Sequence, residues 1–122
     1  VGTEMTMMTF RTTTPESCGI VEVDERRIVR AMCEKVPHPP GNLANAAVYI
    51  VEPTIFSHLE SLGRTFIDFS LDVLPQYIGR IHAWHNDGYH IDIGTPHNLQ
   101  KARCVPEALV RHSRKRDHRN TV

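Results

Sequence analysis

The 122-residue sequence lacks several features that would place it in a specialised class of protein. No apolar run approaches the roughly 20 residues that a bilayer-crossing helix needs, and no basic-then-apolar stretch typical of a secretion signal stands at its start. Lys and Arg together number 14, as do Asp and Glu, so the formal net charge is zero. Because neither sign dominates, the sequence predicts no nucleic-acid partner and no membrane partner.

Cysteines are also few, and they are widely spaced. Cys18, Cys33 and Cys104 form an odd set without a CxxC motif, which is typical of reduced thiols rather than of a disulfide framework. We therefore expect a cytoplasmic protein. The chain begins at Val1 without an initiator Met, in the lead into a predicted strand. We expect that this first residue is not a natural domain boundary.

Apolar periodicity and turn signals predict strands and helices that alternate along the chain, with no internal repeat and no low-complexity tract. The predicted strands cover residues 5–12, 19–24, 28–33, 45–51, 81–84 and 89–92. The predicted helices begin at Pro53, near Ser70 and at Pro96, and a further helix covers residues 107–111. A chain of this length forms one domain at most. This order of elements favours an α/β fold with a mixed sheet.

Three of these elements carry further expectations. The apolar run at residues 45–51 predicts a strand that is buried on both faces. Ser70 is predicted to cap a helix that Pro75 bends. Residues 86–88 read Asn-Asp-Gly and predict a hairpin turn, after which residues 89–92 run back as a strand.

Residues 88–96 read Gly-Tyr-His-Ile-Asp-Ile-Gly-Thr-Pro and hold a carboxylate, Asp92, at the end of that predicted strand. Thr95 and Pro96 form a helix start signal, because the hydroxyl accepts an N–H at the helix end and Pro has none to lose. A carboxylate beside a helix N-terminus is where α/β proteins place metal and phosphate ligands. The same carboxylate could simply cap the turn, and the spacing leaves both interpretations open.

Other polar residues also lie at predicted strand ends. Glu34 and Lys35 follow one strand, and Asn45 begins the next strand after a loop rich in Pro and Gly. Glu34 can accept hydrogen bonds from two sugar hydroxyls, and Lys35 offers a positive charge to a phosphate. Asn45 supplies both a donor and an acceptor. Each of these residues, taken singly, is also typical of a solvated strand end.

Five motifs occur in one order along the chain. They are Gly19 at a strand start, Glu34-Lys35, Asn45 within Asn-Leu-Ala-Asn-Ala-Ala-Val-Tyr, Asp-Phe-Ser-Leu-Asp-Val-Leu-Pro at residues 68–75, and the stretch around Asp92. Together they resemble the sugar-phosphate nucleotidyltransferases, or NDP-sugar pyrophosphorylases. Within that family the chain looks most like the mannose-1-phosphate guanylyltransferase type. The resemblance runs from about residue 10 to residue 102.

The resemblance implies a Rossmann-like α/β fold and an enzyme that joins a sugar 1-phosphate to a nucleoside triphosphate and releases pyrophosphate. It implies that Asp92 is one of two aspartates that hold a catalytic Mg²⁺ and that Lys35 meets the sugar phosphate. It also implies that Gly19, Glu34 and Asn45 hold the sugar. Residues 1–105 would form the sugar-binding half of the domain, and residues 106–122 a C-terminal helix and basic tail.

The chain departs from the family pattern in several places. It has no match to the Gly-rich phosphate loop, the base pocket, the catalytic lysine and the second aspartate of the family's N-terminal half. We therefore expect the C-terminal half, which would be inactive by itself. Val36 stands where Pro is usual, and Ala46-Ala47 replace a position often held by Gly, which crowds the sugar pocket by a methyl group.

Two further expectations concern what the chain binds. The alternative to an enzyme is a non-catalytic sugar-binding or assembly module that partners a full-length enzyme. On either interpretation, the apolar strands at residues 20–23 and 46–51 are expected to leave an open sheet edge, which predicts a homo-oligomer or self-association.

The eight histidines invite a zinc hypothesis, with His82, His85 and His90 as candidates. His82 and His85 lie three apart in a predicted strand, however, and so point to opposite faces. The basic tail at residues 111–119 lacks the interleaved aromatics of a nucleic-acid patch, which favours a solvated terminus.

Overall fold

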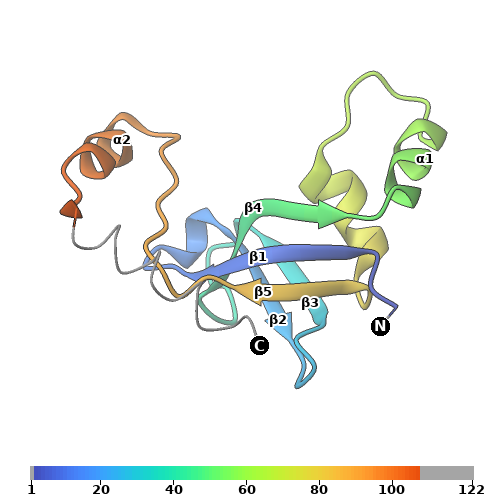
Figure 1. The fold of residues 1–122 in the computed structure, drawn as a ribbon, viewed down its shortest axis with the longest axis horizontal. Coiled ribbons are helices and arrows are strands. Elements are labelled where there is room, and N and C mark those ends of the chain that lie inside the picture. Colours follow the sequence, from blue (N-terminus) through green and yellow to red (C-terminus); the bar gives the residue numbers. More distant parts are fainter. Residues whose placement is uncertain (1, 108–122) are drawn as a thin grey trace. The chain divides into compact units, whose positions relative to one another are not determined.

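The computed structural model describes residues 2–107 (Figure 1). Its contacts divide the chain into two compact units, one ending at His85 and the other beginning at Asn86, and each is described by itself. The strands are β1 (Met5–Arg11), β2 (Gly19–Val23), β3 (Val29–Glu34), β4 (Leu43–Val51) and β5 (Ile81–His85). The helices are α1 (Thr54–Ser61) and α2 (Pro96–Arg103), and the shorter turns are η1 (Pro15–Ser17), η2 (Phe69–Val73) and η3 (Leu74–Tyr77).

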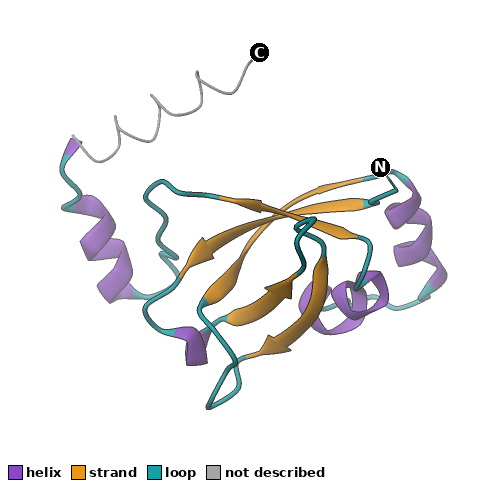
Figure 2. Cartoon of the chain, turned by 90° about the horizontal axis from the view of Figure 1, so that it is seen from below, coloured by secondary structure: helices purple, strands orange, loops and turns teal. Residues whose placement is uncertain are grey.

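The first unit is built on one mixed sheet, as the sequence predicted, and its strand order is β3-β2-β4-β1-β5. β1 runs parallel to β5 and antiparallel to β4, and β2 is antiparallel to both β3 and β4. Figure 2 shows the strands twisting relative to one another, as strands of L-residues do. The predicted β2–β3 hairpin is confirmed, and its register sets Gly19 opposite Glu34.

β5 has partners along both of its edges. β1 pairs with it in parallel, with Met5 opposite Ile81. On the other side, Ile28 forms an antiparallel bridge with His82, and the Ala83 N–H donates to the Arg27 carbonyl at 2.8 Å. The residues just before β3 therefore pair with β5, and the sheet is partly closed.

The core lies on one face of this sheet. Met5 and Met7 of β1 are buried there, because successive side chains of a strand point to opposite faces. They pack with apolar residues from the other strands and from α1, η2 and η3, namely Val21, Val29, Ile55, Val73, Leu74, Tyr77, Ile81 and Ala83. Burial of one such side chain contributes about 1.5–3 kcal/mol.

The other face of the sheet is open at β4, so the prediction that this strand is buried on both faces is wrong. Its outward side chains Val48 and Ile50 are 51% and 75% exposed. An apolar groove of about 330 Å³ runs over this face, lined by Thr6, Met8, Val48, Tyr49, Ile50 and Trp84. The apolar run reflects two different surfaces, one that packs in the core and one that faces outward.

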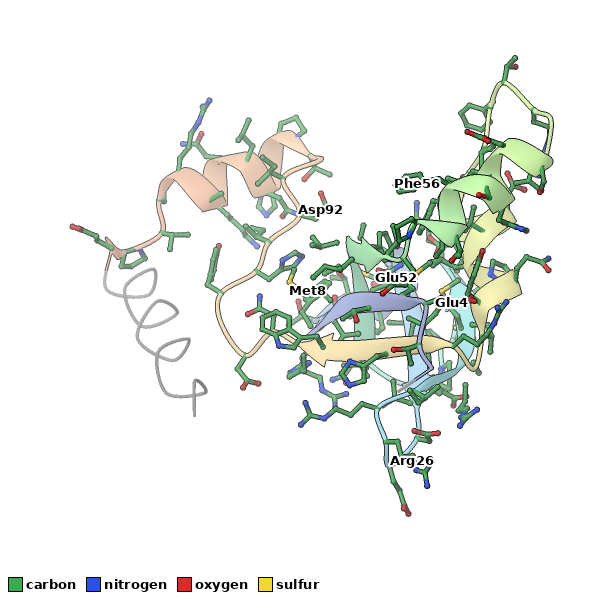
Figure 3. All side chains as sticks on the ribbon, turned by 45° about the vertical axis from the view of Figure 1, so that its right-hand side comes forward. Glu4, Met8, Arg26, Glu52, Phe56 and Asp92 are labelled. Carbon is green, nitrogen blue, oxygen red and sulfur yellow. The ribbon has the colours of Figure 1, made fainter. Side chains whose placement is uncertain are left out.

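The helix predicted after Pro53 is confirmed as α1, with Pro53 at its N-cap position. Gly63 lies just beyond its end at φ +61°, a left-handed conformation that glycine adopts readily. The helix buries Ile55, whereas Phe56 is exposed (Figure 3). The buried apolar face of α1 is therefore narrower than the spacing of its apolar residues predicts.

The predicted cap at Ser70 is wrong, because Asp68 is the capping residue of η2. Its carboxylate accepts a hydrogen bond from the Leu71 N–H at 3.0 Å. η2 is a π-helical turn that passes into the tighter η3 next to Pro75, where the predicted bend occurs. Serine is a favoured capping residue, but the π turn begins at Phe69, before Ser70.

The second unit begins with a turn in which the Asn86 side chain accepts a hydrogen bond from the Gly88 N–H at 2.9 Å. Residues 89–93 form no strand, so the predicted return strand, with Asp92 at its end, is wrong. Since both edges of β5 already have partners, a hairpin has no edge to occupy there. The helix start is confirmed, with Thr95 Oγ1 accepting from the Asn98 N–H at 3.1 Å and Pro96 at the first position.

The helix predicted at residues 107–111 lies, apart from its first residue, outside the described residues. The basic tail at residues 111–119 lies wholly outside them.

Candidate functional site

Three of the predicted site residues meet on the core face of the first unit. Gly19 starts β2, and Glu34 ends β3 opposite it. A Cβ atom built on Gly19 would lie 2.7 Å from Glu34 Oε2 and 3.7 Å from Asn45 Cβ. The carboxylate therefore extends across the space that a side chain at residue 19 would fill, with the Asn45 side chain on the other side. Only glycine leaves this arrangement undisturbed.

The Asn45 amide is held by two hydrogen bonds within β4. Its Nδ2 donates to the Tyr49 hydroxyl at 2.7 Å, and its Oδ1 accepts from the Ala47 N–H at 2.8 Å. The register between β1 and β4 shifts in this region, and Ala47 has φ +56°. A left-handed alanine is uncommon and costs free energy, and such strain often gathers at functional sites. Ala47 belongs to the Ala46-Ala47 pair that, by the resemblance, replaces a position often held by Gly.

Tyr49 belongs to the cluster, and sequence reasoning missed it. Burial raises the pKa of the Tyr49 phenol; the hydrogen bond from Asn45 lowers it, and the negative charge of Glu34 raises it. Its ring lies against that of Phe69, with centroids 4.7 Å apart. The even spacing from Asn45 along a strand places Tyr49 on the same face, and this signal could have pointed to Tyr49.

Lys35 follows β3 directly and is exposed. Its N–H donates to the Cys18 carbonyl at 3.1 Å, and its φ of +49° turns the chain out of the strand. The strict alternation of a strand therefore stops at Glu34. The Lys35 side chain is next to the cluster in sequence, but the register does not fix the face on which it lies.

Asp92 lies in the second unit, on the segment that leads into α2 (Figure 3). It is exposed, and its Oδ1 accepts a hydrogen bond from the Gly94 N–H at 2.8 Å. A Cβ on Gly94 would lie 3.0 Å from that oxygen, so glycine permits the close turn. The Asp92 carboxylate therefore caps the turn, which is one of the two interpretations that the sequence allowed. This interaction uses one of its two oxygens.

These residues fall within a segment that a known family shares. A sequence model of the family described as nucleotidyl transferase matches residues 2–107. The chain belongs to the nucleotidyl transferase family.

Curated relatives cover most of this nucleotidyl transferase chain. The chain is 33% identical over 95 residues to the bifunctional protein GlmU of Methanococcus maripaludis, covering 72% of this chain and 23% of that protein. It is 26% identical over 106 residues to the mannose-1-phosphate guanylyltransferase catalytic subunit beta of Drosophila melanogaster, covering 85% of this chain and 28% of that protein. The chain thus spans about a quarter of the length of these curated relatives.

The fold is also shared with a solved structure. A Bacillus anthracis protein assigned as a glucose-1-phosphate thymidylyltransferase, in complex with sucrose, matches with a TM-score of 0.66 at 19% identity. The match covers 85% of this chain and 45% of that one. At this identity the likeness shows the fold alone, a Rossmann-like α/β fold, as predicted.

The family implies a metal ion, and the described residues fit only part of such a site. Mg²⁺ requires several oxygen ligands in octahedral geometry. Within residues 2–107, no group of three or more His, Cys, Asp or Glu side chains could hold a metal ion. The exposed Asp92 carboxylate fits as a single ligand of a site that residues from elsewhere would complete. None of the described helices is long and apolar enough to cross a membrane.

Proposed function

We propose that this nucleotidyl transferase chain is the sugar-phosphate side, the C-terminal half, of a sugar-1-phosphate nucleotidyltransferase. The observation that carries the proposal is the Gly19–Glu34–Asn45 cluster. An acidic side chain across an open glycine, beside a fixed amide, offers acceptors and a donor to the hydroxyls of a sugar. In the order of its motifs the chain resembles the mannose-1-phosphate guanylyltransferase type.

The proposed reaction transfers a nucleotidyl group. An oxygen of the sugar phosphate bonds to the α-phosphorus of the nucleoside triphosphate, the bond to the bridging oxygen breaks, and pyrophosphate leaves. Glu34 and Asn45 would hold the sugar, and Lys35 would meet its phosphate as a point charge. When bound, Mg²⁺ neutralises charge between the two anions, and Asp92 would supply one of its ligands.

Several parts of the reaction lie beyond the described residues in this proposal. The triphosphate cradle, the nucleotide base pocket and the other metal ligands would come from the rest of the protein, so the isolated chain would not form an NDP-sugar. The proposed setting is the cytoplasm, which the three unbridged cysteines favour.

A second candidate function is a non-catalytic sugar-binding or assembly module that acts with a full-length enzyme. The observation that favours an assembly role is the apolar groove over β4, where Val48 and Ile50 are exposed. Both candidates use the same sugar-binding cluster. They differ in whether the remaining half belongs to the same protein.

Calorimetric titration of the chain with mannose 1-phosphate tests the shared part of both candidates. Glu34→Gln keeps the shape of the side chain but removes its charge, so binding should weaken by about 1.5–3 kcal/mol, as for a hydrogen bond to a charged group. Glu22→Gln is the matched control, since Glu22 lies exposed on β2. Equal affinities in the wild type and Glu34→Gln, or no binding by the wild type, would contradict the proposed sugar site.

A further inference from the structure

The side-chain amide of Asn45 has a defined orientation, because one of its two partners can only donate. The backbone N–H of Ala47 donates at 2.8 Å, so the atom that accepts from it is the amide oxygen Oδ1. The amide nitrogen Nδ2 then lies 2.7 Å from the Tyr49 hydroxyl and donates to it. Both distances are typical of good hydrogen bonds. These two partners therefore assign the oxygen and nitrogen ends of the amide.

This orientation determines what Asn45 can offer to a ligand. Its amide nitrogen carries two hydrogens, and the Tyr49 hydroxyl accepts one of them. The other is a donor on a side chain that is partly exposed. Glu34 and Asn45 flank one point, the place of a Cβ on Gly19, at 2.7 Å from Glu34 Oε2 and 3.7 Å from Asn45 Cβ. The site therefore offers a carboxylate acceptor and an amide donor close together.

This pair of groups complements a sugar hydroxyl. A hydroxyl has one hydrogen to donate and lone pairs that accept, so it can donate to Glu34 and accept from Asn45 at the same time. With the amide turned over, two oxygens would face the single hydrogen of that hydroxyl. One oxygen would then lack a partner, which costs binding free energy. The residue that maintains the orientation of the Asn45 amide is therefore important for binding.

Tyr49 is well placed to hold the nitrogen end of the amide. Its ring packs against the apolar core and against Phe69 of η2, with the two ring centroids 4.7 Å apart. A closely packed ring has little freedom to move, so its hydroxyl stays within reach of the Asn45 nitrogen. The bond from Ala47 alone would leave the amide free to turn about its oxygen. The bond to Tyr49 fixes the amide plane and the direction of the second hydrogen.

We infer that Tyr49 is a positioning residue of the sugar site, which holds the Asn45 amide so that its second hydrogen donates to the same sugar hydroxyl that donates to Glu34. This inference rests on the proposed function and adds the hydrogen-bond pattern by which the cluster recognises a sugar. Tyr49 acts through Asn45 and does not contact the ligand. A sugar without a hydroxyl at this place would leave the donor and the acceptor unpaired and would bind more weakly.

A double-mutant cycle tests whether Tyr49 acts through Asn45. Tyr49→Phe keeps the ring and removes the hydroxyl, so affinity for mannose 1-phosphate in calorimetric titration should fall about 3- to 10-fold, the loss of one neutral hydrogen bond. Asn45→Ala should lose at least as much affinity. In the Asn45→Ala background, Tyr49→Phe should cause no further loss, because the amide that it holds is gone. Two residues that acted independently would instead give additive losses.

Tyr77→Phe is the matched control, since Tyr77 lies in the same apolar core, on η3. It also removes one phenol hydroxyl, but away from Asn45, and should leave the affinity unchanged. If Tyr77→Phe weakens binding as much as Tyr49→Phe does, the loss reports a general loosening of the core and the inference fails.

The outcomes also distinguish this inference from the proposed function. Wild-type affinity in Tyr49→Phe, together with a loss in Glu34→Gln, would overturn the role of Tyr49 and leave the sugar site standing. No mannose 1-phosphate binding by the wild type would overturn both. Should Asn45→Ala not fold, or bind too weakly to measure, nitrogen-15 spectra of the Asn45 side chain decide the matter. Its amide hydrogens must shift when mannose 1-phosphate binds the wild type, and without ligand they must exchange with water faster in Tyr49→Phe than in Tyr77→Phe.

Discussion

At the scale of single residues, the proposed sugar site depends on Gly19, a residue without a side chain. Gly19 has backbone angles that other residues can adopt, so glycine is not needed there for its conformation. It matters because it leaves room for the Glu34 carboxylate. The atom that a Cβ would meet is the far end of the Glu34 side chain, which can rotate away at little cost. A larger residue at position 19 would therefore displace the carboxylate without disturbing the strand.

Gly19→Ala should consequently abolish most sugar-phosphate binding while changing the melting temperature little. The methyl group would sit 2.7 Å from Glu34 Oε2, closer than real contacts allow. Gly41→Ala is the matched control, because a Cβ there meets nothing within 4 Å. Calorimetric titration and thermal unfolding of both variants check this. A folded Gly19→Ala protein with unchanged affinity would show that the Glu34 carboxylate takes no part in binding.

Sequence reasoning found Gly19, Glu34 and Asn45 because each lies at a strand end, and the register then brought them together. It missed Tyr49, because that residue was taken as part of an apolar run buried on both faces, although its even spacing from Asn45 places the two on one face. Nothing in the amino-acid pattern locates a bulge when the residue in the left-handed conformation is alanine. It left Asp92 open between a turn cap and a metal ligand. The hydrogen bond from the Gly94 N–H shows the turn cap, the metal role stays a prediction, and the strand expected before Asp92 does not form.

At the scale of elements, the β2–β3 hairpin is held at its turn by one carboxylate. Asp24 Oδ1 accepts from the Arg26 and Ile28 N–H groups, both at 2.9 Å, and Oδ2 accepts from Arg30 Nε at 2.7 Å. The pKa of Asp24 is lowered, chiefly by the hydrogen bond from the Ile28 N–H and further by Arg30 and Arg26, although desolvation opposes them. The charged carboxylate is thus a structural part of the hairpin that carries Gly19 and Glu34.

The lowered pKa predicts an acid-sensitive hairpin. A carboxyl whose pKa is lower in the folded state stabilises the fold above its ordinary pKa, near 3.9, and loses that effect as the pH falls through the folded value. The wild type should therefore unfold at a higher temperature than Asp24→Asn at pH 6, and the two should converge below about pH 4. Thermal unfolding from pH 6 to pH 3 measures this.

Glu25→Gln provides the control for this pH dependence, because it removes a negative charge from the same turn but leaves the three hydrogen bonds to Asp24 in place. A difference between wild type and Asp24→Asn that stays constant from pH 6 to pH 3 would show that the carboxylate charge is not the stabilising feature.

The elements themselves were predicted best where local signals and tertiary pairing agree. The hairpin, α2 and β5 follow from alternation, capping residues and turns within a few positions. The strand expected at residues 89–92 failed because a strand needs an edge to pair with, and Ile28 and β1 already occupy those of β5. A local sequence pattern does not show which distant segments pair. Here that pairing determined that residues 89–92 form no strand.

At the scale of the whole molecule, the main unexplained surface is the outer part of β4. β1 pairs with one edge of β4 along its length, whereas on the other edge the strand pairs with β2 at a single bridge, Ile20 with Ala44, among the described residues. Beyond Ala44 the strand carries no charged residue and no proline, the devices that usually protect an edge. The apolar groove with Val48 and Ile50 lies on the same strand.

We propose that a second copy of this chain covers this edge by pairing its own β4 in antiparallel fashion. Such a contact is self-complementary about a two-fold axis, and the zero net charge of the chain offers no repulsion against it. Sedimentation velocity should show association of the chain at tens of micromolar, roughly the range where exposed edges associate. Ile50→Lys, which puts a charge into the groove, should shift the protein toward monomer.

The matched control is Phe56→Lys, which changes another exposed apolar residue, on α1 and outside the groove. It should leave the association unchanged, since only the β4 surface takes part. If both lysine variants become monomeric to the same degree, the contact is general hydrophobic adhesion and not strand pairing. If the wild-type chain stays a folded monomer throughout this range, a second copy does not cover the edge.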